Sequence, residues 1–148
     1  MKRSTLLRVG LLWCSLVSCK PDPTPIMTND LSGNWIGDYQ TEQVGTCRWV
    51  GTTPSTVATF TVTNGTVTAM LTQTVGQNKS SDRLTGTLTG NTLRLNQTIN
   101  ATCDGLPRTY TRRFEGAVQG SALTLVSRDT LCPVPGCIFL RTLNLTRQ

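Results

Sequence analysis

The chain of 148 residues contains no histidine, and aromatic residues make up only 5% of it. Without histidine it cannot build Ser–His or Cys–His nucleophile pairs or a histidine metal site. The eight acidic residues follow no spacing typical of catalytic carboxylates. We therefore expect no catalytic residues, no metal and no cofactor, and we interpret the chain as not being an enzyme.

The sequence also lacks an apolar run long enough to cross a bilayer, which needs about 20 residues. Its most apolar stretch, Val9 to Val17, follows Lys2, Arg3 and Arg8 and has the length of a signal-peptide core. We therefore predict a signal peptide over residues 1–18. Its removal halves the net charge from +6 to +3 and leaves no basic cluster, so nucleic acid is not an expected partner.

The apolar run ends in Leu16-Val17-Ser18-Cys19, a branched apolar residue, a tolerant position, a small residue and a cysteine. This order resembles the lipobox of bacterial lipoproteins. The resemblance implies that Cys19 carries a diacylglycerol on its sulfur and becomes the mature N-terminus, and Lys20 after it implies sorting to the outer membrane. The expected location is the bacterial cell envelope, with the membrane as a partner through the lipid. An ordinary signal peptide in which Cys19 falls by chance is the alternative.

Residues 20–25 alternate proline with polar residues, so residues 19–30 are predicted to form a lipidated N-terminus followed by an extended tether. Residues 31–148 are long enough for one domain. Threonine, with 27 residues, favours strands because its branched Cβ packs well on a pleated surface, and no long helical periodicity is present. The domain is therefore predicted to be all-β.

Alternating apolar residues mark eight strands, and an even antiparallel meander can close on itself. The expected strands are 33–40, 57–63, 66–74, 83–89, 92–99, 108–118, 121–128 and 138–147. Two segments, 84–90 and 114–120, echo each other and indicate a repeated hairpin. We predict a single closed antiparallel up-and-down β-barrel.

The predicted connections differ in length between the two ends of this barrel. Tight turns at Asn64-Gly65, Gly90-Asn91 and Gln119-Gly120 would lie at one end. Longer loops would lie at the other, over residues 41–56, 75–82, 100–107 and 129–137. The barrel would then have one pinched end and one open mouth, with the tether joining at the pinched end.

Gly33-x-Trp35 in the first strand resembles the signature of lipocalin- and avidin-like barrels. In lipocalin-like (calycin-type) barrels an arginine of the last strand packs over that tryptophan, and Arg147 matches this arginine by position and parity. The resemblance therefore implies a lipocalin-like barrel with a cation–π contact between Arg147 and Trp35.

Four cysteines, Cys47, Cys103, Cys132 and Cys137, remain in an oxidising compartment and lie in or beside the mouth loops. Their spacing lacks the paired knuckles of a zinc site, so we expect disulfides. Cys103–Cys132 with Cys47–Cys137 joins neighbouring loops and is our preferred pairing. Cys132–Cys137 with Cys47–Cys103 is the alternative.

Inward parity places Arg112 and Arg141 near the mouth, and Tyr110 and Phe139 lie beside them. One interpretation is that these four residues bind a ligand with an anionic head whose tail lies in the barrel. The other is that Asp82, of inward parity at the same rim, or solvent neutralises the arginines.

Two functions fit these features best, ahead of a purely structural role in the envelope. The first is a membrane-anchored envelope lipoprotein that binds a small amphipathic ligand, such as a lipid, in a β-barrel. The second is an envelope inhibitor or protein-interaction module that acts on a protein partner through disulfide-clamped mouth loops. An open apolar cavity would favour the first, and a filled barrel would favour the second.

Overall fold

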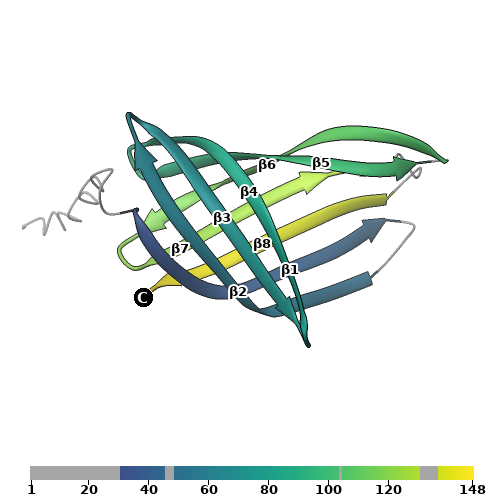
Figure 1. Ribbon diagram of the computed structural model, residues 1–148, viewed down its shortest axis with the longest axis horizontal. Coiled ribbons are helices and arrows are strands. Elements are labelled where there is room, and N and C mark those ends of the chain that lie inside the picture. Colours follow the sequence, from purple (N-terminus) through teal and green to yellow (C-terminus); the bar gives the residue numbers. More distant parts are fainter. Residues whose placement is uncertain (1–30, 46–48, 104, 131–136) are drawn as a thin grey trace, which may run out of the picture.

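The computed structural model describes residues 31–45, 49–103, 105–130 and 137–148, without the side chains of Trp49, Pro54 and Cys137. Eight antiparallel strands follow one another around a closed barrel, and β1 pairs with β8 to complete it (Figure 1). The strands are β1 Gly33–Gly45, β2 Trp49–Thr63, β3 Thr66–Val75, β4 Asn78–Thr89, β5 Thr92–Cys103, β6 Leu106–Gln119, β7 Ala122–Asp129 and β8 Cys137–Arg147. The predicted fold class, strand number and strand order are confirmed.

Tight two-residue turns connect β2 to β3, β4 to β5 and β6 to β7 at one end of the barrel. Asn64 and Gly65 both have positive φ, of 49° and 76°, as the predicted type I′ turn requires. The third turn lies at Gly120-Ser121, one residue later than predicted, and Gly120 takes its positive φ of 59°. This is the pinched end that the sequence predicts.

The predicted long loops at 41–56, 75–82 and 100–107 are wrong, because strands occupy most of these residues. Glycine and proline favour turns, but here the strands continue through most of the residues around them. Pro54 falls where the β1–β2 register shifts and just before β2–β3 pairing begins at Ser55, so it removes no ladder bond. Gly76 and Gly105 supply positive φ in short turns between the long strands.

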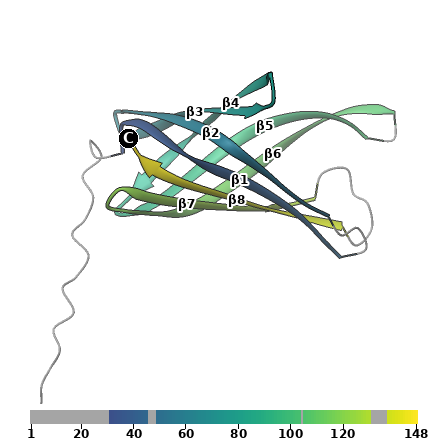
Figure 2. The same cartoon turned by 90° about the horizontal axis from the view of Figure 1, so that it is seen from below.

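The open end therefore consists of projecting hairpins. Pairing of β4 with β5 stops at Leu84 and Gln97, and pairing of β6 with β7 stops at Glu115 and Val126. Beyond these points the β3–β4 and β5–β6 hairpins separate from each other and from β7, as both ribbon views show (Figures 1 and 2).

Three inward-facing glycines lie where the backbone of the adjacent strand leaves no room for a side chain: Gly37, Gly86 and Gly116. A Cβ on each would lie 1.8 Å from a backbone carbonyl oxygen of the adjacent strand. Each glycine is paired with a leucine, namely Leu145, Leu95 and Leu125 respectively. Gly86 and Gly116 occupy the same position in the two echoing segments, so the echo marks two equivalent close approaches between strands.

Apolar side chains fill the barrel from the pinched end to about its middle. The core residues, each 3% exposed or less, are Leu31, Trp35, Ala58, Phe60, Val67, Ala69, Leu71, Leu84, Leu93, Leu95, Phe114, Val118, Leu123, Leu125, Leu143 and Leu145. Because these side chains are almost entirely inaccessible to water, this half of the barrel is a packed core.

Candidate anion-binding site

One level above this core, toward the open end, the strands turn polar side chains inward. Tyr39 lies on β1, Gln97 on β5, Arg112 on β6, Ser127 on β7 and Arg141 on β8. Each of the last four residues lies two positions from a core residue on its own strand, and residues two apart on a strand point to the same side. They therefore point inward with their core neighbours, which are Leu95, Phe114, Leu125 and Leu143 respectively. A polar layer therefore separates the packed core from the mouth.

Two arginines of this layer share one carboxylate. Arg112 Nε donates to Asp129 Oδ2 at 2.6 Å, and Arg141 Nη1 donates to Asp129 Oδ1. Arg112 Nη1 also donates to Gln97 Oε1 at 3.1 Å. The Arg112 and Arg141 side chains are only 9% and 6% exposed, and that of Asp129 is 19% exposed. Two guanidinium ions and one carboxylate give this group, the Arg112–Asp129–Arg141 cluster, a charge of +1.

Tyr39 contributes no negative charge that could cancel this excess. Burial raises the pKa of its phenol, outweighing the lowering effect of nearby Arg112 and Arg141. Its ring packs at a tilt on Phe114, with centroids 6.5 Å apart. Tyr39 is therefore a neutral phenol next to the cluster at ordinary pH.

Ser127 stands directly opposite Arg141 in the β7–β8 pairing and is 2% exposed. Its Oγ is the one buried side-chain oxygen or nitrogen without a hydrogen-bond partner in the part of the chain that the structure describes. An unpaired buried hydroxyl is unfavourable, and such groups mark places where a water, ion or ligand can bind.

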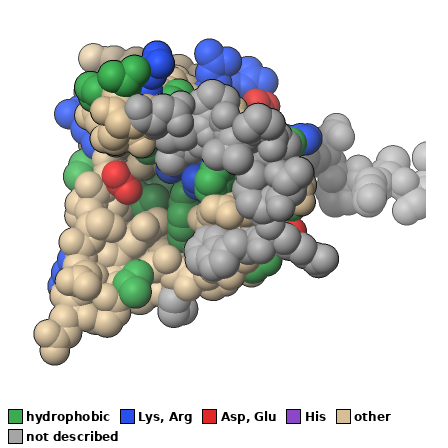
Figure 3. All heavy atoms as spheres, turned by 90° about the vertical axis from the view of Figure 1, so that its right-hand side faces the viewer, with side chains coloured by type: hydrophobic (Ala, Val, Ile, Leu, Met, Phe, Trp, Pro, Cys, Tyr) green, Lys and Arg blue, Asp and Glu red, His purple; other side chains and the backbone are tan. Residues whose placement is uncertain are grey.

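The structure brings together three of the four predicted binding residues. The Arg141 guanidinium lies over the Phe139 ring, with Cζ 4.8 Å from the centroid, and Arg112 joins Arg141 through Asp129. Tyr110 is half-buried, and its hydroxyl lies 3.1 Å from Cys103 Sγ. Figure 3 views this open end and shows basic and apolar side chains deep in the middle of the face.

The prediction that Asp82 neutralises Arg112 and Arg141 is wrong. Asp129 pairs with both arginines, and no ion pair of Asp82 occurs among the described residues. Asp82 lies on the β3–β4 hairpin beyond the point where β4 leaves β5, which moves it away from β6. Asp129 ends β7 with the same inward parity as Leu123 and Leu125, and this parity is the signal that could have identified it.

The cysteine predictions are tested at one position. Cys103 is disulfide-bonded. Cys47 and Cys132 lie outside the described residues, as does the side chain of Cys137, so the pairing stays a prediction. The Cys137 backbone pairs with Gly45, two residues before Cys47. Residues 16–19 of the lipobox also lie outside the described part.

At the pinched end, Trp35 is fully buried and donates from Nε1 to the Leu31 carbonyl at 3.0 Å. Its ring meets Phe60 edge to face, with centroids 6.0 Å apart. Arg147 is the cross-strand partner of Trp35, and its Nη2 donates to the Ser32 carbonyl. The predicted position of Arg147 beside Trp35 is confirmed, and its cation–π contact stays a prediction.

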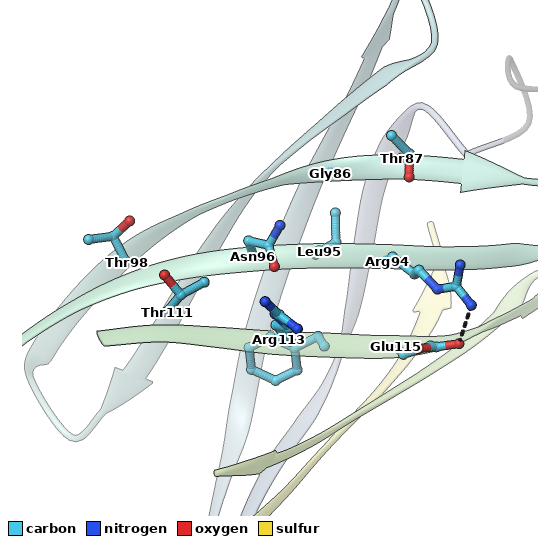
Figure 4. A pocket seen from close by; sticks show the side chains of 10 residues that line it. Gly86, Thr87, Arg94, Leu95, Asn96, Thr98, Thr111, Arg113 and Glu115 are labelled. Atoms are coloured by element: carbon cyan, nitrogen blue, oxygen red, sulfur yellow. Dashed lines mark hydrogen bonds and ion pairs between the residues drawn. The ribbon is translucent and has the colours of Figure 1, made fainter. Parts of the chain in front are cut away.

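A hollow lies on the outer face of β4, β5 and β6, where Arg94 and Glu115 form an ion pair at 3.0 Å (Figure 4). Arg113, Asn96 and several threonines line it, and all of them point away from the barrel interior. Arg113 follows Arg112 in β6, so adjacent residues of one strand carry an inward and an outward guanidinium. Substitution of the outward-facing Arg113 therefore provides a matched control for substitution of the inward-facing Arg112.

Within the described ranges, no helix has the length and apolarity that crossing a membrane requires. The same ranges contain no group of three or more histidine, cysteine, aspartate or glutamate side chains able to hold a metal ion. Comparison with known proteins finds no matching family model, no matching curated protein and no matching solved structure.

Proposed function

We propose that this domain is a non-enzymatic binding module that takes a small anionic ligand at its open end. The observation that supports this is the Arg112–Asp129–Arg141 cluster, in which two nearly buried guanidinium ions share one carboxylate. An uncompensated buried charge is strongly unfavourable, and an anionic ligand would compensate it. Guanidinium groups also match the geometry of carboxylates and phosphates.

The filled lower barrel changes where the rest of the ligand would lie. Core residues directly below the cluster, such as Leu125 and Leu143, are 1% exposed or less, so a ligand tail has no space beneath the arginines. The tail would instead point outward, along Phe139 and Tyr110. We therefore no longer place the ligand tail inside the barrel, and we propose a binding site that is confined to the mouth.

The proposed location of the domain rests on its N-terminal segment. A lipid on Cys19 would anchor the protein in the bacterial envelope, with the outer membrane implied by Lys20. Leu31, the first residue that the structure describes, is buried at the pinched end beside Trp35. The tether would thus attach at the end opposite the cluster, and the mouth would face away from the anchoring membrane. Gly33, Trp35 and Arg147 support a lipocalin-like relationship within this proposal.

Calorimetric titration of the purified full chain with benzoate tests the anionic site. Arg112→Gln and Arg141→Gln should each weaken binding by about 10- to 100-fold, because each removes a hydrogen bond between charged groups. Arg113→Gln, on the outer face of the same strand, should leave the affinity unchanged. Equal affinities in all four proteins would contradict the proposed site.

A series of straight-chain carboxylates tests where the tail lies. A tail that entered an apolar cavity would gain about 0.8 kcal/mol per methylene, or about 200-fold between butanoate and octanoate. With the tail directed outward, we expect a gain below about tenfold. A gain near the larger value would place the tail inside the barrel.

The filled core also favours the second candidate, a protein-interaction module or inhibitor. Under this hypothesis the contact surface is the projecting hairpins, and exposed apolar residues such as Leu106 at the start of β6 would meet the partner. Inhibition assays with purified secreted proteases, comparing the wild type with Leu106→Ser, test this. Inhibition that Leu106→Ser abolishes and Arg141→Gln leaves intact would favour this function over anion binding.

A further inference from the structure

We infer that the ligand's head group is a monocarboxylate, which carries a single negative charge, and that Ser127 donates a hydrogen bond to it. This inference rests on the proposed anion-binding function and specifies the class of anion. It depends on the charge count of the Arg112–Asp129–Arg141 cluster and on the unpaired hydroxyl beside it.

The charge count distinguishes singly charged anions, such as carboxylates, from doubly charged ones, such as phosphate monoesters. Among the described residues, the charged side chains joined in the polar layer are Arg112, Arg141 and Asp129, and their sum is +1. Gln97, which completes the contacts of Arg112, is uncharged. One carboxylate would bring the buried layer to neutrality, whereas a phosphate monoester, with a charge near −2 at neutral pH, would leave an excess negative charge in a low-dielectric site.

Ser127 supplies the second observation. Its Oγ is buried and without a partner in the described part of the chain, and its residue is paired with Arg141 across β7 and β8. Asp129, the neighbouring inward residue of β7, already occupies one nitrogen of each guanidinium. A carboxylate bound to the remaining N–H groups of Arg141 would bring an acceptor to the Ser127 side of that guanidinium. Both the buried charge and the buried hydroxyl would then be satisfied by one group.

Three substitutions vary the charge and the hydroxyl separately while keeping both arginines. Gln97→Glu keeps an acceptor for Arg112 and lowers the cluster charge to zero. Asp129→Asn keeps the side-chain shape and raises the charge to +2. Ser127→Ala removes the unpaired hydroxyl, and it should not impair folding because that hydroxyl makes no hydrogen bond within the described residues.

The experiment titrates each full-length protein with benzoate and with phenyl phosphate at pH 8, where the phosphate is a dianion. The wild type should bind benzoate at least about tenfold more tightly than phenyl phosphate. Gln97→Glu should weaken benzoate binding, Asp129→Asn should reverse the preference in favour of phenyl phosphate, and Ser127→Ala should weaken benzoate binding about tenfold. Arg113→Gln should behave as the wild type does.

The outcomes separate the inference from the function on which it rests. The monocarboxylate assignment would be overturned if the wild type preferred phenyl phosphate. It would also be overturned if neither Gln97→Glu nor Asp129→Asn changed the preference. In both cases the anionic site itself would remain. Benzoate affinity unchanged in Ser127→Ala would overturn the role of Ser127. Failure of the wild type to bind either anion would overturn the proposed function itself, and the inference with it.

Discussion

Asp129→Ala is the substitution that most directly tests how strongly the two arginines depend on one carboxylate. In the native protein the Asp129 oxygens each accept from a guanidinium, and both guanidinium-bearing side chains are less than 10% exposed. Removing the carboxylate would leave two like charges in this layer, and among the described contacts only Arg112 would keep an acceptor, Gln97. Breaking a buried ion pair in this way costs about 3–5 kcal/mol.

We expect a loss near 3 kcal/mol, the lower end of that range, because Asp129 retains 19% exposure and water can partly replace it. Equilibrium urea unfolding with the disulfides intact measures this, since urea, unlike guanidinium chloride, does not screen charges. Glu115→Ala, which removes the exposed partner of Arg94 on the outer face, is the control and should leave the midpoint unchanged. A loss below about 1 kcal/mol for Asp129→Ala would show that the cluster is solvated and would refute the argument from buried charge.

Three further predictions concern other parts of the chain. Gly86→Ala should unfold the barrel or lower its melting temperature by more than 10 °C, because the new Cβ would lie 1.8 Å from a carbonyl oxygen of the paired strand; thermal unfolding followed by circular dichroism checks this. In a Tyr110→Phe background, ultraviolet titration should show Tyr39 ionising above its ordinary pKa of 10.0, because burial raises that pKa. Since the pKa is raised in the folded state, the stabilisation is present below pH 10 and is lost as the pH rises through the folded pKa, an effect that Tyr39→Phe should remove. Cys19→Ser should abolish palmitate labelling in growing bacteria while Cys14→Ser should not, and labelling that persists in Cys19→Ser would contradict the lipobox prediction.

The barrel could be predicted from sequence because its strands obey a period of two over most of their length. The inward residues of β5, for example, run Leu93, Leu95 and Gln97 without interruption. The similarity between segments 84–90 and 114–120 indicates more than the repeated hairpin that we infer from it. It marks Gly86 and Gly116, where only glycine fits against the neighbouring strand.

The extent of the strands could not be predicted in the same way. Gly45, Pro54 and Gly76 are residue types that favour turns. Whether the strands around them continue depends on hydrogen-bonded pairing with strands that are distant in sequence. This error also hid the main carboxylate of the site. The sequence pattern predicts that β7 ends at residue 128 and places Asp129 in a loop, whereas Asp129 is the next inward position of the strand.

The polar layer is difficult to explain by stability alone. Replacing a buried ion cluster with apolar side chains of similar volume is often neutral or stabilising, so Arg112, Asp129 and Arg141 are not needed to hold such a barrel together. The barrel already has a packed core from Leu31 to the level of Leu125 and Leu143. A purely structural layer would also be expected to satisfy its buried groups, yet the cluster retains a charge of +1 and the Ser127 hydroxyl lacks a partner among the described residues. The charge and the hydroxyl lie on paired strands, β7 and β8, on the same side of the mouth. One bound anion would remove both unfavourable terms, and this joint explanation is the reason to look for function at this layer.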